Sequence, residues 1–150
     1  MSNFDPSTFL DVTLTVPTEK RPPIPVGDYQ ALITEVKSRA WNSKDGSKSG
    51  IALDAVLEIQ LPSAVAELVK QLTIKINDSI MLDLTEAGSI DNSPGKNSKL
   101  RRYRDALDMN KPGDSFSPRM MTGRFIGVKI KHDPYEGEIY ERVEAVSRAA

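Results

Sequence analysis

After Gly27 the chain alternates between apolar and polar residues over most of its length, which is the pattern of β-strands with one buried face. The alternation runs from Tyr29 to Ile33 and then shifts phase, so that Val36 and Ala40 continue the apolar set. Such a shift indicates a β-bulge in a long, curved strand. The next strand, 51–61, alternates without a break, and the pattern recurs at 72–76, 80–84, 125–131 and 138–146.

Two segments between these strands have helical patterns instead. A short helix is predicted over 64–70, after Pro62 and with Ser63 as a candidate cap. A longer one is predicted from Lys99 to about Asn110, with Ser98 as its cap. Its apolar face opposes a basic one that carries Arg101, Arg102 and Arg104. Between the two helices, Asn77-Asp78 is expected to form a turn or bulge that separates the stretches at 72–76 and 80–84.

The order of elements is three strands, a helix and then a hairpin. It predicts a mainly β fold: a five-stranded antiparallel Greek-key barrel of the oligonucleotide-binding (OB) type, with a helix between strands 3 and 4. The alternative is an open antiparallel sheet with a helix packed on it. Residues 1–26 hold half of the chain's ten prolines and are expected to form an N-terminal arm, which leaves 27–150 as the folded domain. The arm is either disordered or docked on the domain or on a neighbouring subunit.

The net charge is only −1, but the two signs are segregated along the chain. Residues 95–131 hold ten cations and three anions, and 37–48 hold four cations and one anion. By contrast, 51–91 hold seven carboxylates and two lysines. Two basic segments that fold onto one face would attract phosphate groups, whereas two solvated surfaces would explain the same pattern without a ligand.

Composition excludes several chemistries. There is no cysteine and His132 is the only histidine, which argues against thiolate or histidine metal sites and against a Ser-His-Asp enzyme. We expect no cofactor and no metal. The N-terminus has no secretory pattern and no apolar run approaches membrane length, so we expect a soluble, cytoplasmic protein with no membrane partner.

Several segments together resemble a family of small bacteriophage single-stranded DNA-binding proteins with an OB fold. The resemblance covers roughly 23–146 and rests on the opening Pro25-Val-Gly-Asp-Tyr29, the Gly/Ser/Lys loop at 42–50, Gly123-Arg-Phe125 and a Tyr-Glu-Gly hairpin. It implies coating of exposed strands in phage DNA replication or recombination, in the host cytoplasm, with phage replication or recombination proteins as further partners. The chain departs from the pattern in its proline-rich arm and in ending without an acidic tail.

A protein that binds single strands without sequence preference needs cations for the backbone and exposed aromatic rings for the bases. One candidate set lies on the first strand and in the loop after it: Lys37, Arg39, Trp41, Lys44 and Lys48. A second set lies on the penultimate strand and in its hairpin: Phe125, Lys129, Lys131 and Tyr135, which Tyr140 and Arg142 could extend. Trp41 could instead be a core anchor, and the second set could be packing at a sheet edge. The helix cations fit a solvated face better than a site, and outward Asp54 and Glu58 would repel phosphate.

Other functions fit the residues less well. Asp28 and Glu35-Val-Lys37 are similar to the acidic pattern of metal-dependent nucleases, but seven residues leave little room for the hairpin that normally joins the two carboxylates. We therefore expect a non-enzymatic protein that binds single-stranded DNA largely regardless of sequence. The main alternative is a phage structural or assembly protein whose arm mediates subunit contacts, and a metal-dependent nuclease ranks third. Whether the protein forms a homo-oligomer stays open.

Overall fold

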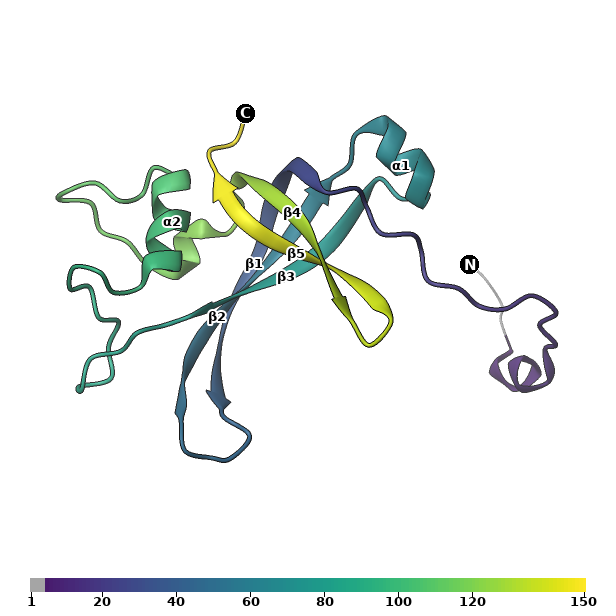
Figure 1. Cartoon of the computed structure of the whole chain (residues 1–150), viewed down its shortest axis with the longest axis horizontal. Helices are drawn as coiled ribbons and strands as arrows, with labels where there is room; N and C mark the ends of the chain where they lie inside the picture. The colour runs from purple at the N-terminus through teal and green to yellow at the C-terminus, as the bar shows by residue number, and fades with distance from the viewer. Residues whose placement is uncertain (1–4) are drawn as a thin grey trace.

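A computed structural model describes residues 5–150, and its centre is one five-stranded antiparallel sheet. The strands are β1 (Gly27–Asn42), β2 (Ser49–Gln60), β3 (Thr73–Met81), β4 (Phe125–Tyr135) and β5 (Glu138–Ser147) (Figure 1). Their order across the sheet is β3-β2-β1-β4-β5. The predicted mainly β, antiparallel sheet of five strands is confirmed. The hydrogen-bonded sheet is not closed into a barrel, because β3 and β5 remain its two edges.

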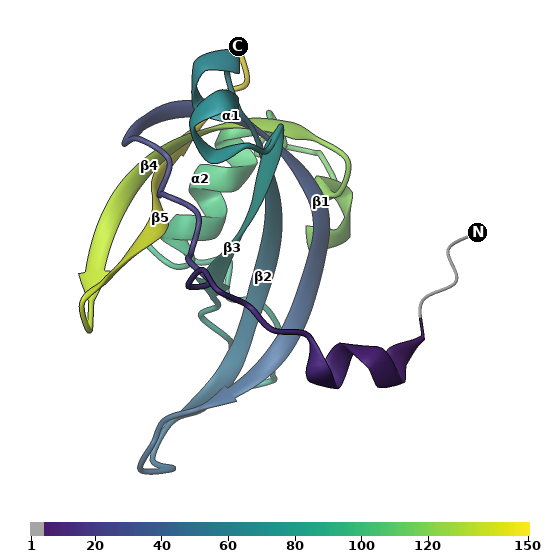
Figure 2. The same cartoon turned by 90° about the vertical axis from the view of Figure 1, so that its right-hand side faces the viewer.

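The long first strand bends across the whole sheet. Its register with β2 shifts between Ile33 and Glu35, which confirms the bulge predicted from the phase of the apolar residues. Before the shift β1 pairs with both β2 and β4. After it β1 pairs with β2, which stays paired with β3 as far as Ala52, and residues 40–42 and 49–51 form the two-stranded tip of the hairpin. In both views this hairpin and the β4–β5 hairpin point to the same side of the molecule (Figures 1 and 2).

The core lies inside the curve of the sheet. Its alternating residues on β1, β2 and β4 are fully or nearly fully buried, among them Ile33, Leu57 and Ile126. Ile24 is also fully buried, although it belongs to the range expected to be the arm. Its backbone explains this, because its N–H donates to Glu141 Oε2 (2.7 Å) and its carbonyl lies 2.7 Å from His132 Nε2. The end of the arm is thus fixed to β4 and β5.

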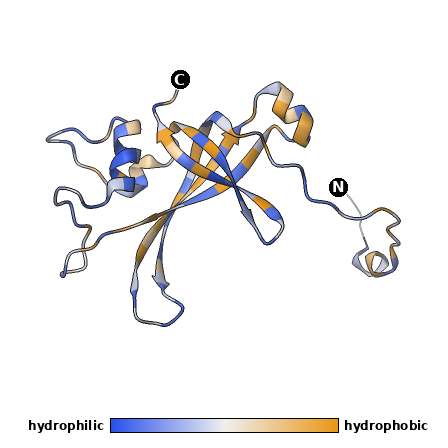
Figure 3. Ribbon diagram, in the orientation of Figure 1, coloured by the Kyte–Doolittle hydropathy of each residue, from blue (hydrophilic) through white to orange (hydrophobic). Residues whose placement is uncertain are grey.

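Two helices flank the sheet, α1 (Ser63–Val69) between β2 and β3 and α2 (Ser98–Ala106) between β3 and β4. Leu100 and Tyr103 of α2, and Leu107 just after it, are buried in the core, as expected for the apolar face of this helix, whereas its opposite face is hydrophilic (Figure 3). The helix is shorter than predicted, and Ser98 is its first residue rather than its cap. Asn97 takes the cap position with a left-handed backbone (φ 52°).

The turn or bulge predicted at Asn77-Asp78 is wrong, because β3 continues through it in unbroken register with β2. The side chain of Asp78 points inward like those of Ile76 and Ile80. Its burial is compensated by α2: Lys99 Nζ lies 2.8 Å from Asp78 Oδ1, and the Tyr103 hydroxyl donates to Asp78 Oδ2. A buried carboxylate with two such donors can occupy a core position of a strand.

The last hairpin turns later than the sequence pattern suggests. β4 extends to Tyr135, and only Glu136 and Gly137 form the turn, both with positive φ (50° and 78°). Two such residues are typical of a tight hairpin between twisted strands. In the arm, a 3-10 helix spans Pro6–Asp11, and a second one, Pro118–Met121, precedes β4. Within residues 5–150 no helix is long and apolar enough to cross a membrane.

Candidate nucleic-acid interface

The outer face of the sheet carries the candidate residues in rows, because cross-strand partners share a face. Lys37 of β1 lies opposite Asp54 of β2, which lies opposite Ser79 of β3. Two residues further along β1, Arg39 lies opposite Ala52 of β2. After two more residues, Trp41 lies opposite Gly50 at the far end of the β1–β2 hairpin. The structure thus places Lys37, Arg39 and Trp41 on one outward face, as their spacing predicts.

Trp41 packs against the sheet rather than standing free of it. A Cβ atom at Gly50 would lie 2.9 Å from Trp41 Nε1, so the indole occupies space that only glycine leaves open. Trp41 is half-buried and lies outside the core cluster. Among the described residues, its Nε1 is the one buried side-chain nitrogen or oxygen without a hydrogen-bond partner. Trp41 is therefore a surface ring resting on the hairpin backbone, which differs from both an interior anchor and a fully exposed stacking platform.

The two strand cations beside Trp41 are paired with acids. Arg39 Nε lies 2.7 Å from Asp54 Oδ2, and Ser79 Oγ donates to Asp54 Oδ1 (2.6 Å). The Ser79 hydrogen bond and then Arg39 hold the pKa of Asp54 below its ordinary value, despite the opposing effect of burial. Lys37 Nζ lies 3.5 Å from Glu35 Oε2. These partners lower the positive potential of this face.

The loop between β1 and β2 is folded around one carboxylate. Asp45 accepts hydrogen bonds from the hydroxyls of Ser43 and Ser47 and from the Ser47 N–H, which lower its pKa to about 2. Lys44 and Lys48 flank this turn, are exposed, and form no ion pair within the described part of the chain. The loop therefore presents two free ammonium groups on an ordered turn.

The tip of the β4–β5 hairpin gathers two exposed tyrosines. Tyr135 and Tyr140 are 62% and 37% exposed, and their ring centroids lie 6.4 Å apart at a tilt of 56°. Lys20 of the arm and Arg142 of β5 lie 5.2 Å and 5.6 Å from the Tyr140 centroid. Lys131 lies opposite Arg142 on the neighbouring strand. Rings and cations thus share one surface here.

Acids partly neutralise this tip as well. Lys20 Nζ lies 2.7 Å from Glu138 Oε2, and Arg142 Nε lies 3.4 Å from Asp133 Oδ2. Both pairs are exposed, so solvent screens them and each contributes little to stability. Lys131, by contrast, has no ion-pair partner in residues 5–150. A phosphate could recruit these cations without breaking buried interactions.

Two residues of the second candidate set lie elsewhere. Phe125 begins β4, ten residues before Tyr135, which corresponds to roughly 30 Å along an extended strand. It is 53% exposed and lies opposite Leu32 of β1. Lys129 lies between the two ends and pairs with Glu144 (3.8 Å). The structure therefore brings Lys131 and Tyr135 together and separates Phe125 from them.

An open hollow of about 450 Å³ separates the two sheet edges beside the tyrosines. One side consists of Lys75, Ile76 and Asn77 of β3, and the other of residues 139–142 of β5. Lys20 and Arg21 of the arm line it too. Arg21 is held by two hydrogen bonds to Glu141 (2.6 and 3.0 Å).

Sequence reasoning missed Lys20, Lys75 and Asn77 as residues of this surface. The outward phase of 72–76 does indicate an exposed Lys75. No signal in the sequence tells that the arm returns to the β4–β5 hairpin, because that depends on Glu138 and Glu141, about 120 residues later.

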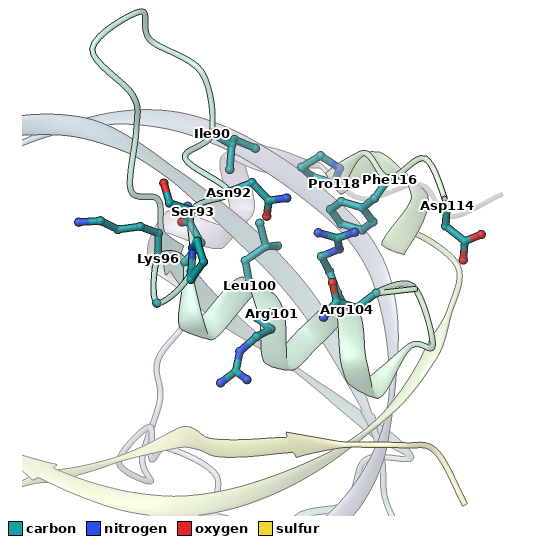
Figure 4. Close-up of a pocket in the computed structure, with 14 residues that line it drawn as sticks. Ile90, Asn92, Ser93, Lys96, Leu100, Arg101, Arg104, Asp114, Phe116 and Pro118 are labelled. Atoms are coloured by element: carbon teal, nitrogen blue, oxygen red, sulfur yellow. The ribbon is translucent and has the colours of Figure 1, made fainter. Parts of the chain in front are cut away.

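The α2 face forms a separate basic surface. A hollow of about 400 Å³ lies between α2 and the loops around it, lined by Lys96, Arg101, Arg104 and Phe116 (Figure 4). The guanidinium of Arg104 lies 4.4 Å from the centroid of Phe116, and its Nε donates to the Met109 carbonyl (3.1 Å). Lys96 and Arg101 extend outward in Figure 4. Arg104 is thus committed to packing, whereas Arg101 is available to solvent.

Among the described residues, acidic side chains do not converge at any point that would suit a metal ion. Within residues 5–150 there is no group of three or more histidine, cysteine, aspartate or glutamate side chains that could hold one. Comparison with protein-family models finds no match, and comparison with curated proteins finds none either.

Proposed function

We propose that this protein is a non-enzymatic, single-stranded DNA-binding protein, with its DNA surface on the β4–β5 hairpin, the adjoining hollow and the β1–β2 loop. The observation that carries the proposal is the exposed pair Tyr135 and Tyr140, surrounded by Lys20, Lys131 and Arg142. Exposed rings stack on unpaired bases, and adjacent cations bind the backbone that connects them. Arginine and lysine next to tyrosine rings also add cation–π attraction.

The arrangement of strands and helices also supports this proposal. We interpret the sheet, open between β3 and β5 and with α2 inserted between β3 and β4, as a partly open OB-type barrel. In that fold the loop between strands 1 and 2 and the loop between strands 4 and 5 flank the ligand surface. Here the first loop carries Lys44 and Lys48, and Tyr135 is the last residue of β4 before the second. A strand of DNA would then run past the hollow between them.

A single strand fits this surface better than a duplex does. The tyrosine faces are useful only to bases that are unstacked, and duplex DNA hides its base faces. The acids beside Lys20, Arg39 and Arg142 moderate the charge, which favours modest, salt-sensitive binding over tight wrapping of a duplex. The outward Asp54 and Glu58 make the centre of β2 unsuitable for phosphate, so the path lies along the loops and β5.

Competition between oligonucleotides tests the proposal. A fluorescent pyrimidine oligomer of about 20 nucleotides is bound at moderate salt and displaced with unlabelled single strand or with duplex of the same length. We expect the single strand to compete at markedly lower concentration. Equal competition by duplex would contradict both the function and the barrel interpretation. A ribonucleotide oligomer added in parallel reports the preference between DNA and RNA.

The biological setting proposed is coating of exposed strands in phage DNA replication or recombination, in the host cytoplasm. An assembly protein is the second candidate, and one observation favours it: the arm carries exposed apolar side chains, such as Leu10 and Leu14, which are 90% and 73% exposed. If a variant without residues 5–19 stops self-associating, and the intact protein binds no oligonucleotide, the assembly function replaces DNA binding.

A further inference from the structure

The arm contains a segment that has the composition of a strand but no partner. Residues 12–16, Val-Thr-Leu-Thr-Val, alternate strictly, contain no proline and have high β-propensity. Val12 has extended backbone angles (φ −67°, ψ 129°). Val12, Leu14 and Val16 are 57%, 73% and 73% exposed, and no backbone group of 12–16 forms a hydrogen bond within the described chain. Unpaired N–H and carbonyl groups on an apolar segment of this kind favour pairing with the edge of a β-sheet.

The sheet offers a matching free edge on β3. The hydrogen bonds from the Leu61 N–H to the Leu72 carbonyl and from the Leu82 N–H to the Ile51 carbonyl show that even-numbered residues of this region bond toward β2. Because antiparallel strands alternate in this respect, the N–H and carbonyl groups of Thr73, Lys75 and Asn77 point away from the sheet. At Ser79 the edge ends, because its carbonyl accepts from Lys99 Nζ (2.7 Å).

We propose that Val12–Val16 of one copy pairs, antiparallel, with the free edge of β3 in a second copy of this chain. The register that fits places Leu14 beside Ile74, so that Thr13 and Thr15 lie opposite Lys75 and Thr73. The apolar side chains then continue the inner face of β3, and the threonines continue its polar outer face. This interaction surface shares Lys75 and Asn77 with the hollow beside the proposed DNA surface, but the proposal rests on the unpaired backbone groups and not on DNA binding.

The ends of the two segments agree with this register. On the arm, the 3-10 helix ends at Asp11 and Pro17 follows Val16, so only five residues are free to join a ladder. On β3, Asp11 would lie opposite Asn77, two residues before Ser79, whose carbonyl accepts from Lys99. At the other end, Val16 would lie against Leu72, which is 82% exposed and lines a hollow of about 390 Å³ beside α1.

We assign the pairing segment to a second copy because the arm of the same chain is already bound to its own β5. Lys20 and Arg21 are held by Glu138 and Glu141, and they line the hollow next to Lys75–Asn77. From there the arm leads away from its own sheet (Figures 1 and 2). Bringing Val12–Val16 back to the same sheet would require a reversal within Pro17–Glu19. An arm that extends outward reaches a neighbour without one.

Cross-linking of single-cysteine variants tests the contact, since the natural chain has no cysteine. Full-length Thr13→Cys and Lys75→Cys are mixed in equal amounts and treated with a short bis-maleimide. We expect a heterodimer on a denaturing gel. In the matched control, Lys75→Cys is replaced by Lys44→Cys on the distant β1–β2 loop, and the yield should fall to roughly a tenth because no pairing raises the local concentration. Equal yields from both mixtures would overturn the contact.

Self-association provides the second measurement. Sedimentation of the full-length protein should show a mass that rises with concentration, and Thr13→Pro should weaken the association roughly tenfold because it removes a ladder N–H. Thr18→Pro lies outside the pairing segment and should leave the association unchanged. A protein that stays monomeric at all concentrations would overturn the proposal. So would a Thr13→Cys/Lys75→Cys double variant that cross-links only within one chain, which would assign the arm to its own sheet.

Discussion

Lys99 on α2 and Asp78 on β3 are joined by an ion pair in which Nζ lies 2.8 Å from Oδ1. The Tyr103 hydroxyl donates to the other oxygen of the same carboxylate. Burial and then the charge of Asp78 raise the pKa of Tyr103, so the phenol stays protonated and keeps donating. One carboxylate in the middle of an edge strand therefore fixes the helix to the sheet.

Replacing Asp78 by alanine should be strongly destabilising. The change leaves the buried Tyr103 hydroxyl without its acceptor and frees Lys99, and we expect a loss of about 3 kcal/mol in the free energy of unfolding. Urea unfolding followed by circular dichroism measures it. Asp114→Ala, at an exposed loop position, is the control and should stay within about 0.5 kcal/mol of the natural protein. Similar values for the two variants would show that Asp78 does not hold α2.

The attachment of the arm should weaken in acid through Glu141. Burial acts to raise the pKa of this carboxyl, but hydrogen bonds from Arg21 and the Ile24 N–H, together with the charges of Arg21 and His132, hold it below its ordinary value of 4.5. A depressed pKa means that the stabilisation is complete above about pH 4.5 and is lost as the pH falls through the folded-state value. Glu141→Gln should therefore lower stability by about 2 kcal/mol at pH 7, and the difference should shrink toward pH 3.

Unfolding of both proteins across this pH range, with Glu136→Gln at the exposed hairpin turn as the control, checks the prediction. A deficit in Glu141→Gln that stays constant from pH 7 to pH 3 would mean that the carboxylate charge plays no part in holding the arm.

The alternation of apolar residues predicted the strands because one face of each is buried, and the phase shift before Val36 predicted the bulge for the same reason. It failed at Asp78, whose core position is decided by Lys99 and Tyr103, more than 20 residues away. It also failed at Ile24, which is buried by contacts to β4 and β5. Local patterns report which face a residue occupies, and partners distant in sequence decide whether a polar residue can occupy a core position.

The candidate site was predictable to a similar extent. The outward positions of Arg39 and Lys131 follow from strand phase. The pairing of Arg39 with Asp54 depends on the register between β1 and β2, and the separation of Phe125 from Tyr135 depends on β4 continuing as one strand. Neither register nor strand length is encoded in the local composition.

The two ends of β4 should differ in their contribution to DNA binding. If bases stack on the hairpin tip, Tyr135→Ala and Tyr140→Ala should each weaken binding to oligo-dT by about 1–3 kcal/mol. Phe125→Ala removes a ring that is also exposed, at the other end of the strand that carries Tyr135, and should change binding little. Fluorescence anisotropy of a labelled oligomer measures all three. A larger loss from Phe125 than from the tyrosines would move the site to the opposite end of the sheet.

The unpaired lysines of the β1–β2 loop should dominate the salt dependence. Lys44→Ala with Lys48→Ala should reduce the slope of log K against log salt by about 0.7 for each phosphate that a lysine no longer neutralises. Arg101→Ala with Arg102→Ala, which removes the same charge from the α2 face, should reduce it less. Binding measured over a series of salt concentrations gives both slopes. The reverse order would place the DNA backbone along α2 and its adjoining hollow.

Trp41 and Gly50 allow the hairpin itself to be tested, because the chain has a single tryptophan. Gly50→Ala puts a methyl group where the indole lies, so Trp41 must leave the hairpin backbone, and its emission should shift to longer wavelength as the ring becomes exposed. If Trp41 in this position forms part of the DNA surface, oligo-dT should quench the emission of the natural protein in step with binding. Gly50→Ala should then weaken binding by about 1–3 kcal/mol, which is the contribution of one stacked base. Ser49→Ala is the matched control, at an exposed neighbouring position, and should change neither emission nor affinity. Saturation with oligo-dT at constant emission, together with unchanged affinity in Gly50→Ala, would remove Trp41 from the DNA surface and leave the Tyr135 and Tyr140 tip to bind the bases.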